Sequence, residues 1–583
     1  MLLVTTPIEK FWDAKKDILF LGEYCKHYSR KEYWQTLNFS TFHTIWSDSS
    51  KKKIYANYLN SIQEKTIEYL VEKLNEVHGT KFSKRYWRIL LTPFLMHYIP
   101  NFFDKYIHIL EVKKMFPHNL STIILSEESF FDINLAEEFI SEMVKDEWNL
   151  QITSQIIQKI GDIKICDIKK LERKDQKIGL MYELKCFLKN IITFLLMFIL
   201  RKSSIRNFCQ QLPLIQSFSL YFFSFFEFVP CKKIKIKKNK YLKNNMEMRS
   251  IFSSYKDVND DKFCDILMQS FEKNFPLQFI EGFEYYFKKA KFLYGSKCPK
   301  VIIQDTSIYS DSLFAMWFAY CIEKGTKSIG FQHGGGYGDR LYNPSQNFEL
   351  KVNDYYISWG WKKEGYNILP LPSPIIYIPQ KKLIEVNNNK DIMLVGTVIP
   401  QHFIRYDCQP IDLQFLEYLN WELRFYQSIS KEISSNFYIR TYPVDYNWNI
   451  KKRLLNNSVR VNSKKNFQEA LLNCKIFVSD NLNTTFLYSL AINKPTILFW
   501  DQNLWESTSE ALHYYSILEK AGIFHRNPES AALKINEIYY SVDLWWKSEE
   551  IQKARLLFVE NYAKTSDCWE RVWVKEIKNL IRY

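Results

Sequence analysis

From residue 301 onward, short apolar runs alternate with amphipathic segments that are long enough to be helices. The runs VIIQ (301–304), SIGFQ (328–332) and YYISWG (355–360) resemble strands, and DSLFAMWFAYCIEK (311–324) between the first two resembles a helix. Such alternation is typical of parallel sheets whose strands are connected by helices. We therefore predict a doubly wound α/β sheet in this part of the chain.

A second alternation begins after LPLPSP (369–374), whose three prolines fit neither a helix nor a central strand and indicate a domain linker. The expected strands are 391–397, 436–443, 459–463, 475–480 and 496–500. The expected helices are 415–430, 466–474, 484–493 and 507–522. This pattern predicts a second α/β domain.

The N-terminal half is less regular. DILFLG (17–22) and TIILS (122–126) are strand candidates, and RYWRILLTPFLMHYI (85–99) has helical periodicity. The predicted domains are an α/β domain over 1–375, a second α/β domain over 386–543, and a closing helix over 544–583 that crosses back. Helical insertions are expected within the first domain at about 25–115 and 150–250. Two such domains face a cleft, and ligands bind at the carboxyl ends of the strands.

Composition excludes a disordered or collagen-like chain, because 46% of the 583 residues are apolar and only 16 are glycine and 18 proline. The 11 cysteines include no C-x-x-C pair, so neither a zinc site nor a disulfide framework is indicated. No export signal is recognisable in MLLVTTPIEKFWDAKK. These features predict a cytoplasmic protein.

The net charge of +15 includes a lysine-rich run, KKIKIKKNKYLK (232–243), that follows the aromatic segment SFSLYFFSFFEF (217–228). The apolar stretch IITFLLMFIL (191–200) is too short to cross a bilayer. Apolar and polybasic segments side by side predict a peripheral contact with an anionic membrane surface, at the inner face of the cell membrane. The alternative is a buried helix followed by a solvated loop. No nucleic-acid-binding module accompanies the charge, so nucleic acid is not an expected partner.

A glycine cluster in FQHGGGYGDR (331–340) directly follows an expected strand. Glycine backbone turns sharply and lets a ligand approach, so Gly334, Gly335 and Gly336 are candidate phosphate contacts. His333 stands at the strand exit, where an imidazole serves as a general base or as a phosphate donor. The alternative is a tight turn with a structural histidine.

A polar turn follows the strand at 475–480 and precedes a helix. Asn481, Asn483, Thr484 and Thr485 are candidate phosphate-binding residues, because the free N–H groups of a helix start attract anions. We expect one of them to cap the helix, and capping alone is the alternative role. Asp480 is a candidate contact for a sugar hydroxyl or an amide.

Five further charged residues are candidate site residues because of their positions relative to the expected strands and helices. Arg440 ends a strand, where a guanidinium suits phosphate, and Asp445 after it is placed to orient Arg440 or bind sugar hydroxyls. Glu23 follows the strand at 17–22 and is a candidate base or sugar-binding residue, with a buried ion pair as the alternative. Arg85 and Arg88 are candidate acceptor contacts, with buried ion pairs as the alternative.

Several motifs together resemble a family of bacterial transferases that are encoded with surface-carbohydrate genes. The motifs are LFLGEYC, YSRKEYW, RYWRILL, FQHGGGYGD, ISWGW, RTYPVDYNW, DNLNTTFLYSLAINKPTILFW and LWWKSEEIQKA. The C-terminal half is also similar to GT-B glycosyltransferases, including CDP-glycerol glycerophosphotransferases and capsular Kdo and sialic acid transferases. The resemblance implies a GT-B-like fold of two Rossmann-type domains, with 1–375 as the acceptor-side domain and 386–543 as the nucleotide-binding domain.

The resemblance also implies roles for particular residues. His333 takes the place of the base or phosphate contact, and Asn483, Thr484 and Thr485 take that of the phosphate-binding element. Two features depart from the pattern. Tyr442-Pro443 replaces a His-Pro dipeptide near Arg440, and Tyr488 stands where relatives carry a ribose-binding glutamate.

The expected activity is glycosyl transfer from a nucleotide-activated sugar, independent of a metal ion and of any cofactor. The expected product is a surface polysaccharide or a lipid-linked glycan. Alternative functions are polyol-phosphate transfer, sugar-nucleotide epimerisation on the same fold, and a non-catalytic scaffold of a glycan assembly. The sequence leaves open the donor, the acceptor, and whether His333 is a base or a phosphate ligand.

Overall fold

The computed structural model describes residues 1–172, 204–231, 239, 241–379, 390–407, 410–463 and 466–582. Two compact units contain them. Unit 1 comprises 1–210, 231–327 and 400–413, and unit 2 comprises 211–230, 328–399 and 414–583. The sequence suggested a boundary between 375 and 386, whereas residues 328–399 here group with the C-terminal part of the chain.

Unit 1 contains a parallel five-stranded sheet near the N-terminus. Its strands are β1 (Leu2–Val4), β2 (Ile18–Phe20), β3 (Phe39–Thr41), β4 (Ser121–Leu125) and β5 (Lys164–Lys169). The order β3-β2-β1-β4-β5 is that of a Rossmann-type sheet. The strands predicted at 17–22 and 122–126 are confirmed as β2 and β4.

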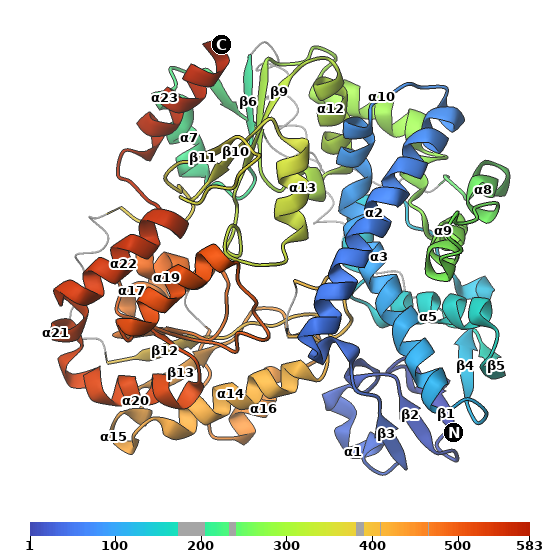
Figure 1. Ribbon diagram of the computed structural model, residues 1–583, viewed down its shortest axis with the longest axis horizontal. Coiled ribbons are helices and arrows are strands. Elements are labelled where there is room, and N and C mark those ends of the chain that lie inside the picture. Colours follow the sequence, from blue (N-terminus) through green and yellow to red (C-terminus); the bar gives the residue numbers. More distant parts are fainter. Residues whose placement is uncertain are drawn as a thin grey trace, which may run out of the picture. The chain divides into compact units, whose positions relative to one another are not determined.

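Two long helices, α2 (Ser49–His78) and α3 (Lys84–Met115), lie side by side in unit 1 (Figure 1). Asp48 accepts hydrogen bonds from the first N–H groups of α2, and Gly79 ends this helix with a positive φ of 59°. Most of α3 is buried, including the ion pair between Asp104 and Lys105. The helix predicted at 85–99 is confirmed as part of α3. The other helices of unit 1 are α1 (Lys31–Trp34), α4 (Ala136–Glu142), α5 (Asp146–Ile160), α8 (Met246–Ser253), α9 (Lys262–Asn274), α10 (Phe283–Tyr294), α11 (Ser307–Ser310) and α12 (Ser312–Glu323).

The expected helical insertion at about 150–250 is corrected by the structure, because this range also contains strands. These are β5, β6 (Ile205–Phe208) and β7 (Phe228–Pro230). Within unit 1, β6 pairs in parallel with β8 (Val301–Gln304), a pairing between segments far apart in the sequence. The apolar stretch 191–200 and most of the lysine run 232–243 lie outside the described residues.

Unit 2 contains parallel strands from two parts of the chain. β9 (Lys327–Phe331), β10 (Tyr355–Ser358) and β11 (Ile368–Pro370) pair in the order β11-β10-β9. β11 overlaps the start of the proline-rich segment 369–374 that was predicted to be a linker, and its edge position explains why proline is tolerated there.

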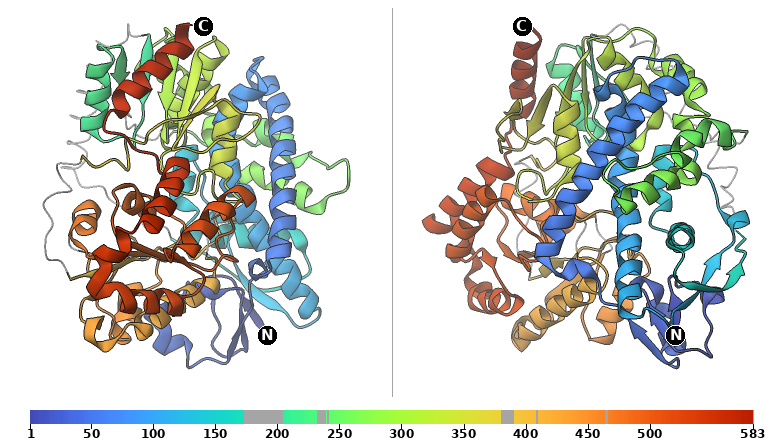
Figure 2. Two further views of the ribbon diagram at one scale, coloured as in Figure 1. Left: turned by 60° about the vertical axis from the view of Figure 1, so that its left-hand side comes forward. Right: turned by 45° about the vertical axis from the view of Figure 1, so that its right-hand side comes forward.

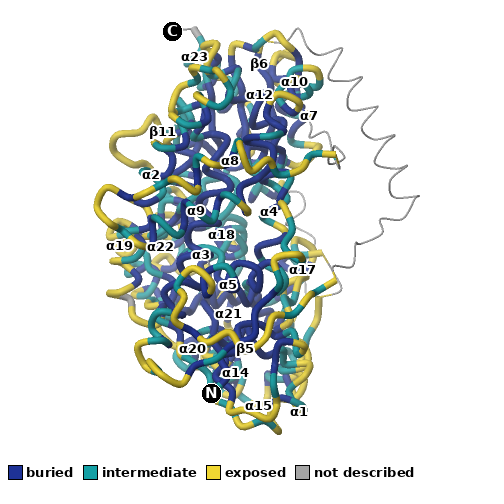
Figure 3. The backbone as a smooth tube through the Cα atoms, turned by 90° about the vertical axis from the view of Figure 1, so that its right-hand side faces the viewer, coloured by how far each residue is buried: buried dark blue, intermediate teal, exposed yellow. Residues whose placement is uncertain are grey.

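The second sheet of unit 2 has the order β13-β12-β14-β15-β16. Its strands are β12 (Ile392–Val395), β13 (Phe437–Arg440), β14 (Ile476–Ser479), β15 (Thr496–Phe499) and β16 (Phe524–His525). Every residue of β12, β14 and β15 is buried. Figure 3 colours the backbone by burial, with buried residues in dark blue. The strand predicted at 459–463 is wrong, because Val461 forms only a single bridge to Ile439.

The helices of unit 2 connect these strands and end the chain. They are α7 (Leu214–Phe223), α13 (Pro344–Val352), α14 (Gln414–Ser428), α15 (Lys431–Ser434), α16 (Ile450–Asn456), α17 (Phe467–Asn473), α18 (Thr484–Ala491), α19 (Ser509–Lys520), α20 (Pro528–Ile538), α21 (Val542–Trp546), α22 (Glu549–Tyr562) and α23 (Trp569–Arg582). The expected closing helix at 544–583 is therefore three helices. Trp573 of α23 donates to the Pro372 carbonyl and packs against Phe331.

The predicted α/β class with parallel, Rossmann-type sheets is confirmed. Among the helices of the described residues, none combines the length and the apolar character that a bilayer crossing requires.

Candidate functional site

Three strands of unit 2 end at the same edge of the sheet. In the register of β12 with its neighbours, Val395 lies opposite Arg440 of β13 on one side and Ser479 of β14 on the other. The strand order reverses between β12 and β14, and ligands of doubly wound sheets bind at the carboxyl side of such a switch point. The residues after β12 and β14 are therefore the candidate binding edge.

The start of helix α18 lies at this edge, immediately after β14. Among the described residues no side chain caps α18, so the expectation that one of the polar turn residues caps it is wrong. Asn483 occupies the cap position, but its amide donates to Thr397 Oγ1 (3.0 Å) and accepts from Arg340 (2.9 Å). The first-turn N–H groups of α18 therefore have no side-chain acceptor, and with the helix dipole they suit a phosphate.

The glycine loop after β9 packs against this helix start. The Gly335 N–H donates to Thr484 Oγ1 at 2.8 Å, although the two residues are 149 positions apart. A Cβ on Gly335 would lie 2.8 Å from both the Asn483 carbonyl carbon and the Thr484 nitrogen. Such a distance is shorter than packed atoms allow, so the loop approaches the helix this closely because residue 335 is glycine. The two constellations predicted from sequence therefore meet within unit 2.

Arg340 joins the glycine loop to the turn before α18. Its Nη2 donates to the Leu482 carbonyl (2.7 Å) and to Asn483 Oδ1 (2.9 Å). Its neighbour Asp339 is buried and accepts from the Tyr515 hydroxyl at 3.0 Å, and burial raises the pKa of Asp339 to about 6. Arg340 was not predicted as a site residue, although it ends the same motif, FQHGGGYGDR. Its position brings a permanent positive charge to the helix start.

His333 is held by a buried glutamate that the sequence did not indicate. Its Nε2 lies 2.8 Å from the Tyr337 hydroxyl and 3.1 Å from Glu349 Oε1. Tyr337 and Tyr356 both donate to Glu349, at 2.9 and 2.8 Å. The His333 side chain is 20% exposed, whereas Glu349 is buried. A carboxylate at this distance orients an imidazole and stabilises its protonated form, as a general base requires.

Asp480 and Asn481 are turned into unit 2. Asp480 accepts from the Tyr418 hydroxyl (2.9 Å) and from Asn481 Nδ2 (2.8 Å), and Asn481 also donates to the Val395 carbonyl. Burial raises the pKa of Asp480 to about 6, and burial beside Asp480 raises the pKa of Glu422 well above its ordinary value. These two predicted site residues therefore support the turn from inside.

Tyr418 connects this buried pair to the helix start. Its hydroxyl oxygen also lies 3.0 Å from Glu422 Oε1 and accepts from the Thr397 N–H (2.8 Å). Thr397 in turn holds Asn483, so hydrogen bonds run from the buried carboxyls to the residue before α18. Thr485 Oγ1 is buried and has no hydrogen-bond partner among the described residues.

Arg440 and Asp445 differ in what holds them. Arg440 is half-buried at the end of β13, and its guanidinium has no hydrogen bond or ion pair with another described residue. Asp445 accepts from the N–H groups of Asn449 and Ile450, at 2.7 and 2.8 Å, and so fixes the start of α16. The Arg440 guanidinium is therefore available to bind a ligand, whereas the Asp445 carboxylate is used within the protein.

The remaining predicted residues belong to unit 1. Arg88 makes a bidentate pair with Glu64, at 2.6 and 2.7 Å, which joins α3 to α2, and Arg85 is half-buried on α3. Glu23 is buried and pairs with Lys26 at 3.0 Å. Its backbone N–H donates to Asp412 at 2.7 Å. The structure therefore gives Arg88 and Glu23 internal ion pairs.

We expect Asp412→Asn to remove a pH-dependent loss of stability in unit 1. Burial, together with the nearby Glu23 carboxylate, raises the pKa of Asp412 to about 7, from about 3.9 in an unfolded chain. A raised carboxyl pKa stabilises the fold below about pH 4, and this contribution disappears as the pH rises to about 7. Asparagine stays neutral and still accepts from Glu23, so the variant should be more stable than the natural protein at pH 7 by about 1–4 kcal/mol.

Unfolding of both proteins between about pH 4.5 and pH 8 measures this difference. Asp445→Asn is the control, because Asp445 accepts similar backbone hydrogen bonds but is not buried. Equal pH dependence of the Asp412→Asn variant and the natural protein would contradict the prediction.

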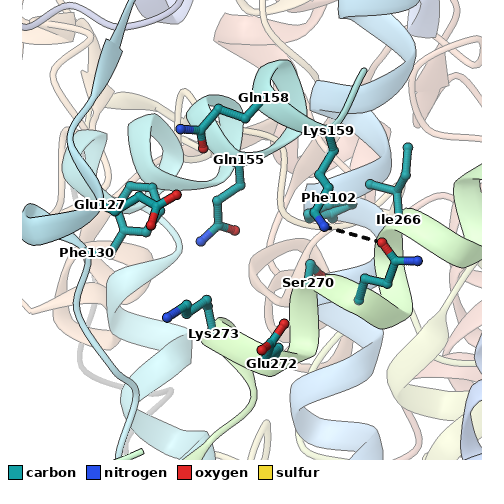
Figure 4. A pocket seen from close by; sticks show the side chains of 11 residues that line it. Phe102, Glu127, Phe130, Gln155, Gln158, Lys159, Ile266, Ser270, Glu272 and Lys273 are labelled. Atoms are coloured by element: carbon teal, nitrogen blue, oxygen red, sulfur yellow. Dashed lines mark hydrogen bonds between the residues drawn. The ribbon is translucent and has the colours of Figure 1, made fainter. Parts of the chain in front are cut away.

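Unit 1 also contains a pocket of about 430 Å³ (Figure 4). It lies between α5, α9 and the segment after β4. Its lining residues are Phe102, Glu127, Phe130, Gln155, Gln158, Lys159, Ile266, Gln269, Ser270, Glu272 and Lys273. The two lysines and two glutamates balance in charge, and Lys159 reaches Gln269 at 3.4 Å. None of the site residues predicted from the sequence lines this pocket. Its size and mixed polarity suit a small polar molecule.

Comparison with solved structures gives only remote likenesses. The wall teichoic acid polymerase TagF shares 10% identity over 70% of this chain and 99% of its own, with a TM-score of 0.32. The spinosyn forosaminyltransferase SpnP shares 10% identity over 68% and 96%, with a TM-score of 0.29. A glycotransferase of kitacinnamycin shares 8% identity over 65% and 98%, with a TM-score of 0.34. These TM-scores are too low to support an argument about function.

Comparison with protein families is decisive, whereas no curated protein matches the sequence. The model of one family, described as "LIC12162 family transferase", matches residues 1–577. The match spans both units and every candidate site residue. The chain therefore belongs to the LIC12162 family of transferases.

Proposed function

We propose that this transferase moves a glycosyl group from a nucleotide-activated sugar to a glycan or lipid-linked acceptor, in the synthesis of a bacterial surface polysaccharide. The observation that carries the proposal is the contact of the glycine loop with the uncapped start of α18, beside Arg340. A helix start with a guanidinium and glycine N–H groups is suited to a nucleotide diphosphate or monophosphate.

The proposed chemistry follows from these groups. As the sugar–oxygen bond breaks, negative charge grows on the departing phosphate. The dipole of α18, Arg340 and Arg440 would stabilise this charge without a metal ion or a cofactor. His333, oriented by Glu349, would take the proton of the acceptor hydroxyl.

Thermal unfolding of the purified protein with CMP, CDP, UDP, GDP and dTDP tests the phosphate site. A nucleotide at about 100 times its Kd should stabilise the fold by about 2.7 kcal/mol. Arg440→Ala and Thr484→Ala should reduce this effect, whereas Arg526→Ala should not, because Arg526 is an exposed arginine paired with Glu519. If no nucleotide stabilises the folded natural protein, the proposal is wrong.

We also propose that the protein is cytoplasmic and peripheral at the inner face of the cell membrane. The support is the sequence 232–243, which carries seven lysines. Lipid-linked acceptors would explain such a location.

A further inference from the structure

Helix α7 presents a broad apolar face that no described residue covers. Ile215, Phe218 and Phe222 follow each other at helical spacing and are 82%, 61% and 65% exposed. Leu214 and Phe223 flank them and are also exposed, whereas Ser217 and Leu220 on the opposite side are buried. The helix is therefore anchored by one side and exposes large apolar side chains on the other.

The turn after α7 extends this face. Phe225 and Phe226 are both exposed and both have positive φ, 57° and 67°. Bulky residues seldom adopt this conformation, because the Cβ crowds the backbone, so two in succession are a strained feature. Their N–H groups bond to the carbonyls of Phe222 (3.0 Å) and Tyr221 (2.9 Å), which holds the turn. The backbone thus maintains two phenylalanine rings in solvent at a conformational cost.

Basic side chains from α23 lie beside these rings. Figure 2 shows α23 next to α7, and Ser219 donates to Glu570 at 2.6 Å between the two helices. Arg571 lies over the Phe223 ring at 5.8 Å, and Lys578 lies near the Phe225 ring at 5.9 Å. Two carboxylates accompany these cations at the border of the apolar face, since Lys578 also pairs with Glu227 at 2.9 Å and Glu570 accepts from Ser219.

Seven exposed apolar side chains on one helix and its turn amount to several hundred Å² of apolar surface, more than a soluble monomer ordinarily exposes in one place. Exposed phenylalanine and leucine side chains with lysine and arginine nearby are also found on helices that lie in a membrane interface. A second copy of the chain would cover the apolar side chains equally well, but the lysine-rich run 232–243, which follows this face in the sequence, favours a negatively charged partner.

We propose that α7 and residues 224–226 insert their apolar side chains into the interface of an anionic lipid bilayer, with Arg571 and Lys578 at the headgroups. This inference names the residues of the proposed membrane contact, and it rests only on the proposed peripheral membrane location. Nucleotide binding and glycosyl transfer are not required for it.

Flotation of the full-length protein with vesicles tests the inference. The vesicles are phosphatidylcholine alone or with about 30% phosphatidylglycerol. The natural protein should float with the anionic vesicles and less so at high salt. A triple variant, Phe218→Ser, Phe222→Ser and Phe225→Ser, should bind them at least about tenfold more weakly. Leu533→Ser with Leu544→Ser is the matched control, because these leucines are exposed elsewhere in unit 2 and should not affect flotation.

A second variant, Arg571→Gln with Lys578→Gln, retains the apolar face and should lose mainly the preference for anionic vesicles. The inference is overturned if the natural protein does not float, or if the triple variant floats equally well. It is also overturned if light scattering shows that the triple variant changes only the oligomeric state. Nucleotide stabilisation of the triple variant, measured in parallel, separates a failure of this inference from a failure of the proposed transfer.

Discussion

Replacement of His333 by alanine should lower kcat about 10²- to 10⁴-fold, with the donor that the nucleotide series identifies. The reason is that His333 is the only imidazole beside the glycine loop among the described residues, and Glu349 holds it in place at 3.1 Å. If His333 is the base, kcat should fall while the donor KM and the stabilisation by nucleotide stay the same. Steady-state kinetics and thermal unfolding measure the two quantities separately.

His513→Ala is the matched control, because His513 is exposed on α19 in the same unit and should not affect kcat. A loss of nucleotide stabilisation together with kcat would assign His333 to phosphate binding. Full activity of His333→Ala would contradict both roles and would favour a structural histidine. Glu349→Gln should give a smaller loss than His333→Ala, because Glu349 acts through the imidazole.

The parallel strands of unit 2 were predictable because each is a short apolar run between polar residues. β12, β14 and β15 are buried on both faces, so their residues are apolar without alternation. The segment 459–463 (VRVNS) begins with the alternation of a half-buried strand yet forms only one bridge, because such a pattern does not reveal whether a neighbouring strand is available.

The sheet of unit 1 was largely missed for a different reason. β1 and β3 have three residues each, and β3 has one apolar residue and is largely half-exposed. β2 is equally short but lies in the longer apolar run DILFLG, which made it recognisable. β1 and β3 become recognisable only through pairing, since β1 joins β2 and β4 in register. The family was predicted instead from motifs spread along the chain, and the match of the family model to residues 1–577 confirms it.

The candidate site was predictable only as separate pieces. The glycine loop and the turn before α18 are local motifs, and both lie at the predicted strand ends. Their contact, the role of Arg340 and the support of His333 by Glu349 depend on side chains that folding brings together. No spacing in the sequence indicates that Glu422 is buried beside Asp480, because the two residues come from α14 and the end of β14.

Substitution of Gly335 by alanine should weaken nucleotide binding at least about tenfold and destabilise the protein by about 1–3 kcal/mol. The added methyl group would lie 2.8 Å from backbone atoms of Asn483 and Thr484, which cannot move without displacing the start of α18. The same shift would break the 2.8 Å hydrogen bond from Gly335 to Thr484. The first-turn N–H groups would then no longer point at the phosphate position.

Gly334→Ala is the matched control, because its methyl group would meet only the Thr484 hydroxyl, at 3.4 Å, which is an ordinary contact. Thermal unfolding with and without the stabilising nucleotide compares the two variants. If both bind nucleotide like the natural protein, the close approach of the loop to α18 is not what forms the binding site. If only Gly335→Ala loses nucleotide binding, the contact on which the proposed phosphate site depends requires a residue without a side chain at position 335.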